Sequence, residues 1–128
     1  MELLEGNGIV YVFQAVIAFS VLRVWLINRK NPSNWRAGNA LTLKEEFEVY
    51  GLPEWIFYTV GFLKITFSIG LLAGFWIPET IIPSAAGIAF LMLSAVFMHI
   101  KVKDPIMKSF PAFLFLLLSI LILLFFEN

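Results

Sequence analysis

Four apolar stretches, each long enough to cross a lipid bilayer, occupy most of this chain of 128 residues. A spanning helix needs about 20 mostly apolar residues, because the hydrocarbon core is about 30 Å thick and a helix rises about 1.5 Å per residue. Pro111 interrupts the last stretch, so that span either kinks there or begins at Phe110. We predict an all-α fold, a transmembrane four-helix bundle with spans at about residues 8–27, 53–74, 80–100 and 106–126.

The composition agrees with a membrane protein of one domain, residues 1–128. Hydrophobic residues make up 60% of the chain and charged residues only 14%, whereas a soluble domain carries about 25% charged residues. The chain has no cysteine, which excludes disulfide exchange and thiolate metal sites. Its formal net charge is zero, so the composition gives no reason to expect nucleic acid as a partner.

The basic residues indicate how the chain is placed in the membrane, because short loops rich in lysine and arginine stay in the cytoplasm. Seven of them lie between spans one and two or between spans three and four: Arg29, Lys30, Arg36, Lys44, Lys101, Lys103 and Lys108. We expect an integral protein of a bacterial inner membrane with both chain ends outside. The four tryptophans, Trp25, Trp35, Trp55 and Trp76, are expected near the membrane interfaces.

The first loop, about 25 residues long, has room for a structure of its own. Thr42 and Glu45 have the spacing of a capping box, in which each side chain binds a free backbone N–H at a helix start. Leu43, Phe47 and Tyr50 then follow at helical spacing. This pattern predicts a short amphipathic helix at the cytoplasmic interface.

Lys64 stands at the midpoint of the second span, where a charged side chain is costly unless a partner, a cavity or a function accounts for it. A helical wheel places Lys64 on a face with Phe57, Val60, Gly61, Ser68 and Leu71, and we expect Lys64 to point into the bundle. No acidic residue lies in any span at the same depth. Two interpretations stay open, a structural hydrogen-bond anchor and a ligand or proton site. Its expected neighbours are polar and neutral: Tyr11, Gln14, Ser68 and Ser94.

Other polar residues complete the candidate site. His99 lies near the cytoplasmic end of span three and is a ligand-binding candidate, although a lone histidine there is more often an interface residue. Glu54 and Asp104 are interface candidates at the ends of spans. The sequence offers no catalytic set and no metal-ligating set.

Several short motifs in order from about residue 43 to 112 resemble the DoxX-like family. They are Tyr50-Gly-Leu-Pro-Glu-Trp55, Gly61-Phe-Leu-Lys64, Ser68-Ile-Gly-Leu-Leu72, Ala86-Gly87, Met92-Leu-Ser-Ala95, His99 and Asp104-Pro105. The resemblance implies a four-helix membrane protein, and it carries over Glu54, Lys64, His99 and Asp104 as candidates without a fixed role. Many members of the wider family have an acidic residue where Lys64 stands. The family takes its name from a membrane subunit associated with a quinone-linked sulfur oxidoreductase, and other members look like accessory or assembly proteins.

Three hypotheses about function follow. The first is a non-catalytic accessory or anchor subunit that binds a membrane or cytoplasmic protein partner. The second is a binder or carrier of a small hydrophobic molecule, a quinone or a lipid, that uses Lys64 in the bundle interior. The third is a subunit of a quinone-linked oxidoreductase, which would need electrons from another subunit because the sequence has no flavin, haem or metal motif. The sequence favours a protein that is not an enzyme, with the lipid bilayer as its surroundings and quinone as the one cofactor to consider.

Overall fold

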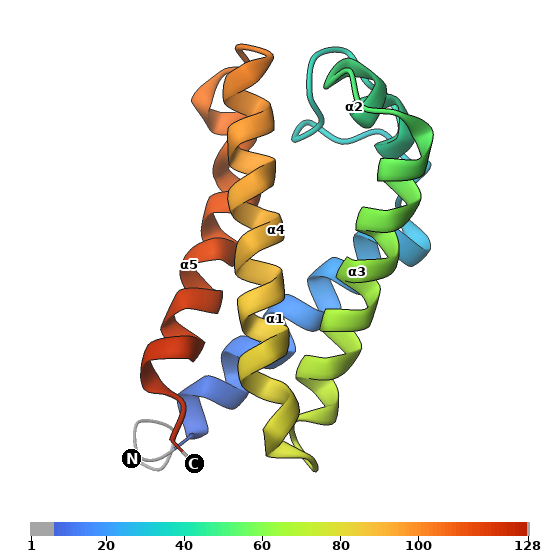
Figure 1. The fold of residues 1–128 in the computed structure, drawn as a ribbon. Helices are drawn as coiled ribbons and strands as arrows, with labels where there is room; N and C mark the ends of the chain where they lie inside the picture. The colour runs from blue at the N-terminus through green and yellow to red at the C-terminus, as the bar shows by residue number, and fades with distance from the viewer. Residues whose placement is uncertain (1–6, 128) are drawn as a thin grey trace.

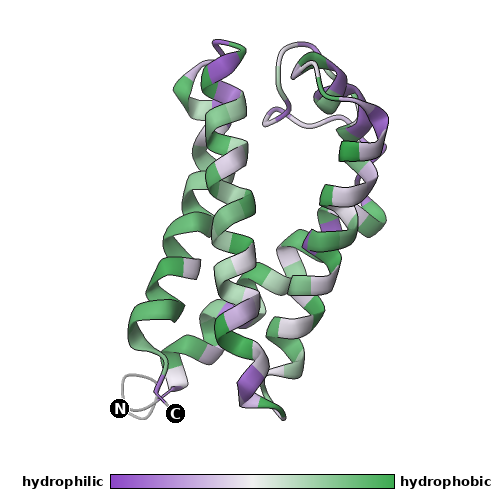
Figure 2. Ribbon diagram, in the orientation of Figure 1, coloured by the Kyte–Doolittle hydropathy of each residue, from purple (hydrophilic) through white to green (hydrophobic). Residues whose placement is uncertain are grey.

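The computed structural model describes residues 7–127, and all regular structure in that range is helical. Four of its helical segments are long and apolar enough to cross a membrane: Gly8–Ile27, Glu54–Ala73, Pro78–Lys101 and Ile106–Phe125. Figure 1 shows them as a bundle, and Figure 2 shows hydrophobic residues along most of their length. The predicted all-α membrane bundle is confirmed.

The spans contain short irregular turns beside their α-helices. Span one is α1 (Gly8–Leu22) followed by a π-helical turn, η2 (Arg23–Ile27). Span two is α3 (Glu54–Ala73). Span three joins a 3₁₀ turn, η3 (Pro78–Thr80), to α4 (Ile81–Lys101). Span four joins the 3₁₀ turn η4 (Ile106–Ser109) to α5 (Phe110–Phe125).

The two prolines near span starts act differently. Pro111 lies in the first turn of α5, so of the two expected outcomes the structure has the helix start at Phe110. A proline is tolerated there because a first-turn N–H has no partner within the helix. Pro53 is the residue before α3, with φ −69° and ψ 159°, and so lies just outside the helix rather than at its first position.

The first and last described residues, Asn7 and Glu127, meet at one end of the bundle, which we call the terminal end. Asn7 Nδ2 donates to Glu127 O at 2.6 Å, and Glu127 N donates to Asn7 Oδ1 at 2.7 Å. We call the opposite end the α2 end. α1 contacts both α5 and α3, and in Figure 1 it crosses obliquely behind α4 from the α5 side to the α3 side.

Small residues bring α3 and α4 together near the terminal end. Gly70 packs against Ser84, and Gly87 packs against the Phe67 ring, so that a methyl group at either glycine would collide with its neighbour. Close backbone approach of this kind is typical of membrane helices. Toward the α2 end the two helices diverge (Figure 1).

The first loop contains the predicted short helix, α2 (Leu43–Val49). Thr42 Oγ1 accepts a hydrogen bond from Glu45 N at 3.1 Å, as the capping box predicted. The Glu45 carboxylate accepts from Leu41 N at 2.8 Å instead of from Thr42 N. Leu43 and Phe47 are buried, so the apolar face of α2 packs onto the bundle and closes its end.

Trp25, one of the four tryptophans expected near the membrane interfaces, is buried inside the protein, with 5% of its surface exposed. Its ring packs over Gly61 and also contacts the aromatic rings of Phe47 and Phe57. The absence of a side chain at Gly61 leaves space for the indole. The other three tryptophans, Trp35, Trp55 and Trp76, are exposed.

Candidate functional site

A cavity of about 420 Å³ lies toward the α2 end of the bundle, where α3 and α4 diverge. Its volume falls within the range of about 300–1,000 Å³ that is common for small-molecule sites. It is lined by residues from α1, η2, the first loop with α2, α3, α4, η4 and α5. The apolar part of its wall includes Val21, Met92 and Phe115, and its polar part includes Arg36, Lys64 and His99.

Lys64 lines this cavity from α3. The helix face that carries it is turned inward: Phe57, Gly61, Ser68 and Leu71 are buried, and Val60 is partly buried. Its Nζ lies 5.5 Å from the centroid of the Trp25 ring, a distance at which a cation is attracted by the ring electrons. Among residues 7–127, no hydrogen bond or ion pair engages this Nζ. The ammonium group is therefore held beside an aromatic face with its donors unused.

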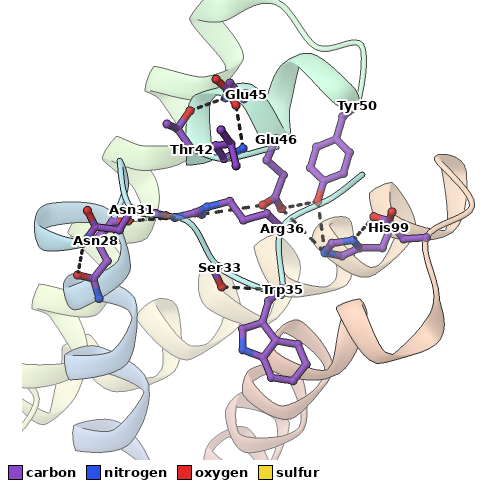
Figure 3. A network of polar contacts seen from close by, with 12 residues as sticks. Asn28, Asn31, Ser33, Trp35, Arg36, Thr42, Glu45, Glu46, Tyr50 and His99 are labelled. Atoms are coloured by element: carbon purple, nitrogen blue, oxygen red, sulfur yellow. Dashed lines mark hydrogen bonds and ion pairs between the residues drawn. The ribbon is translucent and has the colours of Figure 1, made fainter. Parts of the chain in front are cut away.

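A group of five side chains, which we call the polar cluster, lies at the α2 end of the cavity: Arg36, Glu46, Tyr50, His99 and Asp104. Figure 3 labels the first four of them. The Tyr50 hydroxyl donates to Glu46 Oε1 at 2.6 Å and lies 3.3 Å from His99 Nε2. The other ring nitrogen, His99 Nδ1, lies 2.8 Å from Asp104 Oδ2. Within the described part of the chain, no group of three or more acidic or histidine side chains is placed to hold a metal ion.

Arg36 comes from the irregular part of the first loop, yet it is only 5% exposed. Its Nη2 donates to the carbonyl oxygens of Asn28 and Asn31, each at 3.0 Å (Figure 3). Its Nη1 lies 4.0 Å from Glu46 Oε2, and its buried Nε has no partner among residues 7–127. Burial lowers the pKa of Arg36, while Glu46 and Tyr50 act in the opposite direction. Arginine is nevertheless charged in proteins.

Asp104 lies in the turn after α4 and links this turn to the first loop by a hydrogen bond. Its Oδ1 accepts a hydrogen bond from Gly38 N at 3.0 Å, and Gly38 has a φ of +54°, which glycine adopts without strain. Burial alone would raise the pKa of Asp104, but the hydrogen bonds from His99 and Gly38 outweigh it and hold the pKa below 3.8. Lys108 Nζ donates to Gly38 O at 2.7 Å and fastens the same loop.

Tyr50 is held as a neutral donor. Burial first, and then the neighbouring Glu46 carboxylate, raise the pKa of Tyr50 above its ordinary value of 10.0. A buried phenol beside a carboxylate keeps its proton, because ionisation would place two negative charges side by side. Its hydroxyl group therefore donates a hydrogen bond to Glu46 throughout the neutral pH range.

The structure brings together two of the six ligand-binding candidates, Lys64 and His99, at the cavity wall. The other four lie elsewhere. Gln14 is buried between α1 and α3, where its Nε2 donates to Leu71 O at 2.8 Å, and Ser68 is buried on α3. Tyr11 packs on Phe75, and the Ser94 hydroxyl donates to Phe90 O at 2.9 Å in its own helix.

The two interface candidates, Glu54 and Asp104, lie in different surroundings. Glu54 is exposed at the start of α3 and forms a 3.1 Å ion pair with Lys44. Hydrogen bonding to Glu54 raises the pKa of Lys44. Both side chains are largely exposed, and such surface pairs contribute little to stability. Asp104, in contrast, belongs to the polar cluster.

Sequence reasoning missed three residues that shape the site: Trp25, Arg36 and Glu46. A signal existed for Glu46, because it lies four residues before Tyr50 in the predicted short helix and such pairs share a helix face. Arg36 lies in a segment without periodicity, so no pattern could place it. Trp25 could have been found only by pairing it with Gly61 on another helix.

Comparison with known proteins gives one finding. The model of the DoxX-like family matches residues 35–121, which is more than half of the chain and includes α2, Lys64 and the whole polar cluster. No curated protein and no solved structure matches the chain. With four apolar helices and this match, the chain belongs to the DoxX-like family and is an integral membrane protein.

Proposed function

We propose that this protein binds a small, largely apolar molecule inside the membrane, and that the cavity beside Lys64 is the binding site. The observation that carries the proposal is an ammonium group at the wall of a 420 Å³ cavity with no hydrogen-bond or ion-pair partner among residues 7–127. A charge kept at this depth is costly and points to function.

The lining suggests how such a molecule would lie. Val21, Met92 and Phe115 offer an apolar wall for its body. Lys64 offers three donors for its head group, and Trp25 holds the ammonium in position. A quinone carbonyl or a lipid head group would suit these donors.

We also propose an orientation. The basic residues of the first loop and of the turn after α4 lie at the α2 end, so this end faces the cytoplasm and both chain ends lie outside. A bacterial inner membrane fits this arrangement. The cavity would then lie in the cytoplasmic half of the bundle.

An accessory or anchor subunit is the second candidate function. It is favoured by the apolar side chains Trp35, Leu41 and Val49, which lie outside the spans and are at least 40% exposed. Exposed apolar residues beside polar ones suit contact with a partner protein.

Native mass spectrometry of protein extracted from its own membranes tests the first proposal. We would compare wild type with Lys64→Met, and use Lys30→Met as a control because Lys30 is exposed and does not line the cavity. We expect a small molecule to stay with wild type and the control and to be lost from Lys64→Met. An equal amount retained by Lys64→Met would contradict the role of Lys64.

The same spectra test the second candidate. A second polypeptide bound at fixed stoichiometry, without a small molecule, would favour the accessory role. In that case variants at Leu41 and Val49 should release the partner, and Lys64→Met should not.

A further inference from the structure

The cavity has an excess of positive charge. Three cationic side chains line it, Arg36, Lys64 and Lys108, against one carboxylate, Glu46. Asp104 is not a lining residue, and its carboxylate is taken up by His99 and Gly38. The side chains that line the cavity therefore carry more positive than negative charge.

The one lining carboxylate is already engaged. Glu46 Oε1 accepts a hydrogen bond from the Tyr50 hydroxyl, and Glu46 Oε2 lies 4.0 Å from Arg36 Nη1. No ion pair joins Glu46 to Lys64 within residues 7–127. Glu46 thus pairs with Arg36, and Lys64 is left without a direct ion pair among the described residues.

Two cationic groups at the cavity have donors without partners. Arg36 Nε is buried and unbonded among the described residues, and Lys64 Nζ contacts the face of Trp25. A buried charge or donor without a partner is unfavourable unless something else supplies the missing acceptor. A bound anion would meet both needs at once.

We propose that the ligand is an amphiphile with one negatively charged head, a carboxylate or a phosphate, and an apolar body. This inference rests on the proposed function. It specifies the head group of the largely apolar ligand, which carries a negative charge. The head lies between Lys64 and Arg36, and the body lies along Val21, Met92 and Phe115. A cavity of 420 Å³ suits a single chain or a small ring system better than a two-chain lipid.

A pair of matched probes tests the charge of the head. Dodecyl phosphate and dodecanol have the same chain, and only the first carries a negative charge. Their binding would be measured by calorimetric titration of the full chain in nanodiscs of zwitterionic phosphatidylcholine. We expect dodecyl phosphate to bind at least about tenfold more tightly than dodecanol, the factor that one charge-assisted hydrogen bond supplies.

Variants place the preference in the cavity. Lys64→Met should reduce the preference for dodecyl phosphate over dodecanol to less than about threefold. Lys64→Arg should retain most of this preference, and Lys30→Met should leave it unchanged. Because Lys64→Arg keeps the charge, it separates loss of the cation from damage to the fold. A preference of equal size in Lys64→Met would overturn the inference, since the phosphate would then be bound elsewhere.

The remaining outcomes separate this inference from the proposed function. Equal binding of both probes, lost in Lys64→Met, would support the cavity as a binding site and overturn the anionic head. No binding of either probe would overturn both proposals. Inorganic phosphate is the third arm, and we expect it not to compete at equal concentration. Full competition would show a site for free anions and overturn the amphiphile.

Discussion

Lys64 Nζ lies 5.5 Å from the centroid of the Trp25 ring, and the same indole covers Gly61 one turn earlier on α3. The lysine, the tryptophan and the glycine thus form one packing unit between η2 and α3. A larger side chain at Gly61 should therefore displace the Trp25 ring and, with it, part of the cavity wall.

The first prediction concerns Gly61→Ala. A Cβ at Gly61 would lie 2.6 Å from Cζ3 of Trp25, so the indole must move. We expect a loss of about 1–3 kcal/mol in the free energy of unfolding, as is usual for an overpacked core. In a Trp25→Leu background the same change should cost little, because the clash is gone and alanine favours a helix by about 1 kcal/mol over glycine. A double-mutant cycle of thermal unfolding in detergent measures this coupling, and additive effects would contradict it.

The second prediction concerns the start of α2. Thr42→Ala removes the hydrogen bond from Thr42 Oγ1 to Glu45 N and should cost about 1 kcal/mol of stability. Thr59→Ala is the control, because Thr59 is exposed within α3 and caps no helix. Thermal unfolding of both variants should show a lower midpoint for Thr42→Ala alone. Equal midpoints would mean that the cap contributes nothing.

The third prediction concerns pH. The pKa of Asp104 is below its ordinary value of 3.8 in the folded protein, so the ionised carboxylate stabilises the fold. This contribution is complete above about pH 5 and is lost as the pH falls through the folded-state pKa. At pH 7, Asp104→Asn should lower the free energy of unfolding by about 1 kcal/mol, because charge-assisted hydrogen bonds become neutral ones.

Thermal unfolding at two pH values checks this. The difference between wild type and Asp104→Asn should be present at neutral pH and shrink as the pH falls through the folded-state pKa of Asp104, which lies below 3.8. Glu54→Gln is the control, since its exposed pair with Lys44 should give a small effect at either pH. A difference for Asp104→Asn that does not change with pH would show that its charge has no part in stability.

The fourth prediction concerns orientation. The chain has no cysteine, so single cysteines can be introduced at Asn39 and at Glu79, both of which are exposed. They lie at opposite ends of the bundle. A membrane-impermeant maleimide applied to intact cells should label the variant at Glu79 and not the one at Asn39, and inverted vesicles should give the reverse pattern. Labelling of both from one side would refute the proposed topology.

Much of the fold could be predicted because it depends on short-range patterns. The length of each apolar stretch determines a span, since the bilayer thickness is constant. The Thr42 and Glu45 pattern predicted the start of α2, although the glutamate bonds Leu41 N and not Thr42 N. The choice between a kink and a late start at Pro111 stayed open, because both satisfy the backbone and only packing against α4 and α1 selects one.

The candidate site could be predicted only in part. Helical periodicity was enough to predict that Lys64 faces inward, because the sequence alone shows which residues share one face of a helix. The expected neighbours Tyr11, Gln14 and Ser94 were chosen by polarity, and none of them lines the cavity. Depth along a span does not say which helices are adjacent or how they tilt.

The sequence by itself determined the class of this protein, its four spans, the cap of α2 and the inward face of Lys64, because each depends on hydrophobicity or on residues within a few positions of one another. The tertiary structure decided what lies around that lysine. Gly61 admits the Trp25 ring, and the first loop folds back so that Arg36 meets Glu46 beside His99. The last four side chains named come from η2, the irregular part of the first loop, α2 and α4, and only the crossing of α1 and the divergence of α3 from α4 bring them to one cavity.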